Sequence, residues 1–74
     1  MGRYSELPEP WHSLGLALNS GQRIGLAGAL AAAFGVGRLT VRRWASGESP
    51  LEGPALQLFL LLCKMHRIDP TKKN

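Results

Sequence analysis

Apolar residues recur at intervals of three and four along most of the chain, which predicts four helices. Their expected ranges are 10–18, 22–34, 38–45 and 54–67. Gly35 follows the second range and Ser46-Gly47 ends the third, and both glycines suit left-handed positions at helix C-termini. The pattern therefore predicts an all-α fold, a compact domain of four to five helices over residues 10–68. We expect a flexible arm over residues 1–9 and a tail over residues 69–74.

The second and third predicted helices are joined only by Gly35-Val36-Gly37, so they must cross at a steep angle. This is the geometry of a helix-turn-helix, in which the second helix can enter a groove of DNA. On a wheel of about 100° per residue, one side of the third helix is apolar and predicted to face the core. The core side consists of Val41, Trp44 and Ala45, and the opposite side of Leu39, Arg42 and Arg43.

The outward side of the third helix has the chemistry of a DNA-reading surface. An arginine can bind guanine O6 and N7 together, and a leucine can pack on a thymine methyl group. Thr40 lies at the edge of this side, where a hydroxyl suits a phosphate oxygen. The alternative is a solvated arginine surface with one isolated exposed leucine, because single exposed leucines are common.

Charge is distributed unevenly along the sequence. The net charge is +4 and the pI about 10.0, and no Asp or Glu occurs between Pro10 and Gly47. The same stretch contains four arginines, namely Arg23, Arg38, Arg42 and Arg43. A stretch of one sign favours a polyanionic partner, although basic residues can also simply keep a small apolar domain soluble.

The segment LAAAFGVGRLTVRRWASG, residues 30–47, resembles the helix-turn-helix of the lambda-repressor/Cro-like transcriptional regulators. The family pattern is a Leu-Ala pair, a turn glycine, Thr-Val, a basic residue, Trp and a final Gly. The matching residues are Leu30-Ala31, Gly35, Thr40-Val41, Arg43, Trp44 and Gly47. The following SPLEGPALQLFLLL is similar to the loop and next helix of small members. The resemblance implies a helical DNA-binding domain that forms dimers and represses transcription at palindromic operators.

The resemblance also implies roles for individual residues. Gly37 would open the recognition helix, Arg38 and Leu39 would contact bases, and Arg42 and Arg43 would reach bases or phosphates. Backbone contacts are implied for Thr40 and Ser46, and Gln22 and Arg23 could add phosphate contacts if the second helix starts early. Two positions depart from the family pattern. Gly37 stands where Ser or Thr is usual, and Ala27 stands where Gln is frequent.

The fourth predicted helix is apolar on two opposite sides. One side carries Leu56, Phe59, Leu60 and Cys63, and the other Leu58, Leu61, Leu62 and Met65. A helix that is apolar all round must be buried all round, and a domain this small can cover only one side. We therefore expect a homodimer interface at Leu58, Leu61, Leu62 and Met65. The alternative is that the N-terminal arm, with Tyr4, Leu7 and Trp11, folds over that side.

The remaining chemistry is sparse. The single Cys63 is expected in the core, and His12 and His66 complete no metal-ligand spacing with it. The acids are scattered and no nucleophile–base pair is visible, so we expect neither an enzyme nor a cofactor. The longest apolar run, residues 58–63, is too short for a membrane span. With no apolar leader at the N-terminus, a cytoplasmic protein is expected.

These observations lead to a sequence-specific, dimeric repressor that binds double-stranded DNA and regulates its own operon. Antitoxins, Cro-like phage repressors and regulators encoded beside anti-CRISPR genes all fit this description. The alternative is a protein-interaction module, such as an antitoxin that binds a toxin through the fourth helix. A third interpretation, non-specific DNA compaction, would require charge spread over the whole surface rather than concentrated on one helix.

Overall fold

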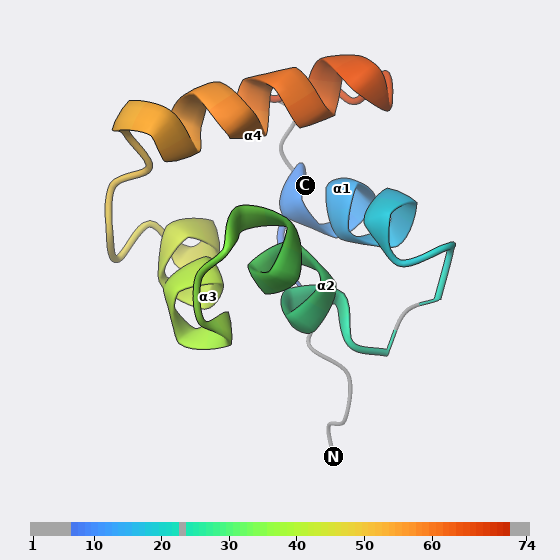
Figure 1. Ribbon diagram of the computed structural model, residues 1–74, viewed down its shortest axis with the longest axis horizontal. Helices are drawn as coiled ribbons and strands as arrows, with labels where there is room; N and C mark the ends of the chain where they lie inside the picture. The colour runs from blue at the N-terminus through green and yellow to red at the C-terminus, as the bar shows by residue number, and fades with distance from the viewer. Residues whose placement is uncertain (1–6, 23, 72–74) are drawn as a thin grey trace.

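The computed structural model describes residues 7–22 and 24–71 and contains four helices in that part of the chain. These are α1 (Trp11–Leu18), α2 (Leu26–Phe34), α3 (Arg38–Ser46) and α4 (Gly53–Met65). α4 lies across one side of the molecule, and the three shorter helices form the layer beneath it (Figure 1). No strand occurs in residues 7–22 and 24–71, so the predicted all-α, four-helix architecture is confirmed.

The core is built around the indole of Trp11. Its ring centroid lies 4.6 Å from that of Phe59 on α4 and 6.1 Å from that of Trp44 on α3. Phe34 of α2 adds a third ring at 6.0 Å. Aromatic pairs at such distances contribute beyond the area they bury. Trp11 therefore ties together all four helices.

α2 begins four residues later than the sequence predicts. The Asn19 side chain donates hydrogen bonds to the carbonyl oxygens of Gln22, at 2.9 Å, and Ile24, at 2.8 Å. Gly25 then adopts a left-handed conformation, with φ of 86°, immediately before the helix. These bonds keep Gln22 and Ile24 out of the helix, because a carbonyl engaged in this way does not enter a helical ladder. Ile24, expected on the buried side of the helix, is instead 72% exposed.

α1 and α2 approach each other closely at Gly15. A β-carbon built on Gly15 would lie 3.1 Å from the β-carbon of Leu26, which is tighter than most real contacts. Gly15 is buried in the middle of α1, where glycine is otherwise unfavourable. The missing side chain therefore sets the spacing between the two helices.

α4 is rotated slightly from the position that the sequence predicts. Phe59 and Cys63 are buried, and Leu56 and Leu62 pack against the core as half-buried residues. Leu60, expected on the core side, is 41% exposed. The sequence places Leu60 on the core side and Leu62 on the outer side, and the structure shows the reverse. A helical wheel gives relative directions within a helix but not the direction in which the rest of the protein lies.

The C-terminal end of α4 lies two residues before the predicted end. Arg67 adopts a left-handed backbone conformation, with φ of 57°. The Ile68 amide donates to the Cys63 carbonyl at 2.7 Å and the Arg67 amide to the Lys64 carbonyl at 3.2 Å. This pair of bonds is a Schellman motif, which turns the chain so that Ile68 packs on the core.

The end of the predicted N-terminal arm lies against the body of the protein. Leu7 packs against the core, and a carboxylate oxygen of Glu9 accepts hydrogen bonds from the amide and hydroxyl of Ser13. Tyr4 and the rest of residues 1–6 lie outside the described residues, as do residues 72–74 of the predicted tail.

Candidate nucleic-acid interface

α3 separates apolar and basic residues as its sequence predicts. Val41 is fully buried, and Trp44 packs edge-on to Phe34 with ring centroids 5.5 Å apart. The opposite side of the helix is exposed and carries Arg38, Leu39, Arg42 and Arg43. Leu39 is 59% exposed although it lies among arginines. These four residues are called the α3 surface below.

The N-terminus of α3 has no side chain that caps it. Gly37 occupies the N-cap position in an extended conformation, with φ of −79° and ψ of 161°, and offers no hydroxyl. The first amides of a helix carry partial positive charge, so anions are favoured beside them. The exposed Gly37 and the α3 surface thus combine an unblocked helix end with arginine side chains.

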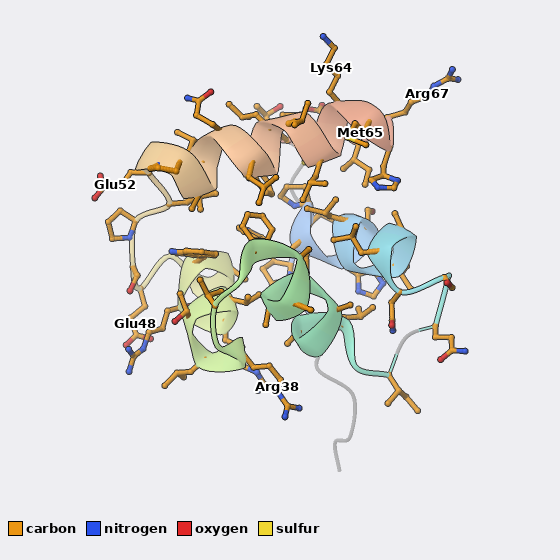
Figure 2. All side chains as sticks on the ribbon, in the orientation of Figure 1. Arg38, Glu48, Glu52, Lys64, Met65 and Arg67 are labelled. Atoms are coloured by element: carbon orange, nitrogen blue, oxygen red, sulfur yellow. The ribbon has the colours of Figure 1, made fainter. Side chains whose placement is uncertain are left out.

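Arg38 lies where α2 and α3 meet. A β-carbon built on Gly28 of α2 would be 3.8 Å from Cδ of Arg38, so the aliphatic part of this side chain runs along α2. The guanidinium group projects away from α4, on the far side of the molecule (Figure 2). Arg38 therefore extends the basic surface from α3 towards α2.

Arg43 forms an ion pair within the protein, and Ser46 forms hydrogen bonds. Nε of Arg43 lies 3.9 Å from a carboxylate oxygen of Glu48, and both side chains are well exposed. Such a pair contributes little and can separate readily. The Ser46 hydroxyl donates to the Arg43 carbonyl at 3.3 Å and accepts from the Glu48 amide at 3.4 Å. Ser46 thus closes the end of α3, a role that spacing alone did not indicate.

The other predicted DNA-contact residues have different positions. Thr40 is half-buried at the edge of the α3 surface. Gln22 is exposed in the loop before α2 and not in a helix, and Arg23 lies outside the described residues. Ile24 is an exposed apolar residue of this loop that sequence analysis missed, because helical spacing assigned it to the core.

The predicted interface residues on α4 fall into two groups. Leu61 is 53% exposed and Met65 64% exposed, and Leu58 is half-buried. Leu62 packs against the core instead. An exposed apolar surface thus exists on α4, and it consists of Leu58, Leu61 and Met65 rather than all four predicted residues.

The described residues offer little other chemistry. Cys63 is buried as expected, and burial together with the nearby Asp69 charge raises the pKa of its thiol. A buried thiol of this kind is a poor nucleophile. Within residues 7–22 and 24–71, no three His, Cys, Asp or Glu side chains gather as metal ligands would, and no helix is long and apolar enough to cross a membrane.

Comparison of the chain with protein-family models, with curated proteins and with solved structures finds no match. The case for a function therefore depends on the residues themselves.

Proposed function

We propose that this protein is a sequence-specific, DNA-binding transcriptional repressor that acts as a dimer on an inverted-repeat operator. The observation that carries the proposal is the α3 surface. It presents arginines and an exposed leucine on a short helix that is anchored by Val41 and Trp44. The lambda-repressor/Cro-like pattern of residues 30–47 supports the same conclusion.

Each member of the α3 surface has a role suited to its chemistry. Arg38 and Arg42 bind guanine edges in the major groove, where a bidentate contact distinguishes one base pair from another. Leu39 packs against a thymine methyl group. Arg43 leaves its weak pair with Glu48 and binds a base or a phosphate, since exposed pairs of this type cost little to separate.

Phosphate contacts fix the orientation of the helix in the groove. The uncapped amides after Gly37 point to a phosphate oxygen as their partner, and Thr40 lies close enough in the sequence to add its hydroxyl. Repression then follows from occlusion of RNA polymerase, which needs no further domain. The described residues suggest no enzymatic step and no cofactor in this mechanism.

Selection from a random pool of DNA duplexes tests the proposal. Folded protein is mixed with the pool at about 150 mM salt, because lower salt strengthens non-specific binding to phosphates. Enrichment of an inverted repeat supports a specific regulator, and the half-site identifies the bases read by Arg38 and Arg42. Survival of an unbiased pool contradicts the proposal.

The alternative is a protein-interaction module that binds through α4. The exposed Leu60, Leu61 and Met65 favour it, because apolar side chains of this size on one helix are typical of a protein contact. It predicts that the selection enriches no sequence and that a heterologous protein partner binds α4.

A further inference from the structure

Four apolar residues of α4 form a regular stripe along one side of the helix. Pro54, Leu58, Leu61 and Met65 are separated by four, three and four residues and fall within about 60° of one another on a helical wheel. Pro54, Leu61 and Met65 are exposed and Leu58 is half-buried. This spacing is that of the apolar seam by which two helices pack side by side. The four residues are called the α4 stripe below.

We propose that the α4 stripe pairs antiparallel with the same stripe of a second copy of this chain. The two antiparallel stripes can be aligned so that their midpoints coincide. Leu58 then lies opposite Leu61 of the second copy, and Pro54 lies opposite its Met65. Every stripe residue then meets an apolar partner, and the contact is self-complementary, as a two-fold interface requires.

Charge at the two ends of α4 favours the antiparallel direction. Glu52 precedes the N-terminus of α4 and Arg67 follows its C-terminus, and both are exposed (Figure 2). The register that matches the stripe brings the end of α4 that carries Glu52 in each copy next to the end that carries Arg67 in the other. A parallel pair would instead place like charges together, which is unfavourable.

The pairing supplies the second copy that the proposed function requires, but it needs no DNA and is tested without it. One pair of short helices gives an interface at the low end of specific complexes, so we expect a monomer–dimer equilibrium at micromolar concentrations. Sedimentation equilibrium of the full chain without DNA measures it. A protein that stays monomeric over the whole concentration series overturns the pairing, whereas the selection experiment judges the DNA-binding proposal separately.

Leu61→Glu and Leu60→Glu form a matched pair of variants. Both leucines are exposed neighbours on α4, but only Leu61 belongs to the stripe. Leu61→Glu is expected to weaken the dimer by about tenfold or more, because it loses apolar contact and places two carboxylates near each other. Leu60→Glu is expected to leave the association constant within about threefold. An equal loss in both variants contradicts the assigned stripe.

Charge reversal tests the register even if a leucine variant fails to fold. Glu52→Lys and Arg67→Glu are each expected to weaken the dimer severalfold, because each places like charges next to one another. The double variant Glu52→Lys/Arg67→Glu restores opposite charges across the interface and is expected to recover the wild-type association constant. Additive loss in the double variant overturns the antiparallel register, and circular dichroism confirms that all three proteins are folded.

Discussion

The outward sides of α3 and α4 are chemically opposite although both helices pack on the same core. α3 turns arginines and one leucine to the solvent, whereas α4 turns out Leu60, Leu61 and Met65. In Figure 2, Arg38 and Lys64 mark opposite sides of the molecule. The core therefore decides only which side of a helix is hidden. The residues on the other side decide the partner, which we propose is a polyanion for α3 and an apolar surface for α4.

Both surfaces depend on the same support. Trp44 connects α3 to Trp11, and Phe59 connects α4 to it, with ring centroids 6.1 Å and 4.6 Å from the Trp11 indole. A change at Trp11 should therefore remove both surfaces together. Changes on the surfaces themselves should affect one surface and leave the other intact.

Trp11→Ala is expected to destabilise the protein by about 3–5 kcal/mol, because it removes a buried indole and leaves a cavity at the centre of the core. That is a large part of the stability of a small domain, so urea unfolding should show a mostly unfolded chain at 25 °C. Gln57→Ala, on the exposed side of α4, is the control and should stay near the wild-type midpoint. A folded Trp11→Ala protein that retains both DNA binding and dimerisation would refute the shared support.

Arg42→Ala and Arg38→Ala are each expected to weaken operator binding by about 1–3 kcal/mol, the worth of a good bidentate contact with a guanine. Fluorescence anisotropy with the selected duplex measures the loss. Lys64→Ala removes the same charge from the opposite side of the molecule and should change affinity much less. If all three variants lose affinity equally, net charge rather than the α3 surface determines binding.

Gly15→Ala and Gly28→Ala are expected to change stability in opposite directions. Alanine at position 15 would bring its β-carbon 3.1 Å from that of Leu26, and overpacking of this kind costs about 1–3 kcal/mol. Alanine at position 28 meets only Cδ of Arg38 at 3.8 Å, so it should gain up to about 1 kcal/mol from helix propensity. Thermal unfolding of the two variants checks the signs. A stabilised Gly15→Ala protein would show that α1 and α2 are less tightly packed than described.

Gly37→Ser tests the uncapped start of α3 and has the smallest expected effect. A serine hydroxyl at the N-cap position should stabilise the helix by a few tenths of a kcal/mol relative to glycine. It also restores the residue type that is usual in the lambda-repressor/Cro-like pattern. Urea unfolding measures the gain, and operator titration shows whether a capped helix end binds phosphate better or worse. A loss of stability contradicts the N-cap geometry of Gly37.

Sequence periodicity was most successful where local spacing alone decides the outcome. It identified Val41 and Trp44 as the inward side of α3, and Gly35 and Gly47 as the left-handed ends of α2 and α3. These features depend on residues within one or two turns of each other. The sequence also predicts the turn between α2 and α3, because that turn depends on neighbouring residues alone.

Other features depend on contacts that spacing does not contain. The start of α2 is set by two hydrogen bonds from Asn19 to carbonyls three and five residues away. The rotation of α4, which exchanges Leu60 and Leu62, is set by where the other three helices lie. The path of the loop after α3 brings Glu48 to Arg43 and uses the Ser46 hydroxyl. Each of these needs the tertiary arrangement.

Titration of the wild-type protein with two duplexes tests whether it is a dimeric, sequence-specific DNA-binding protein. One carries the selected inverted repeat with half-sites about 34 Å apart, and the other has one half-site scrambled. We expect two protein copies on the intact repeat, with an affinity about a thousandfold or more above that for unrelated DNA, and a large loss on the scrambled duplex. Equal affinity for both duplexes and for unrelated DNA would contradict the proposed function.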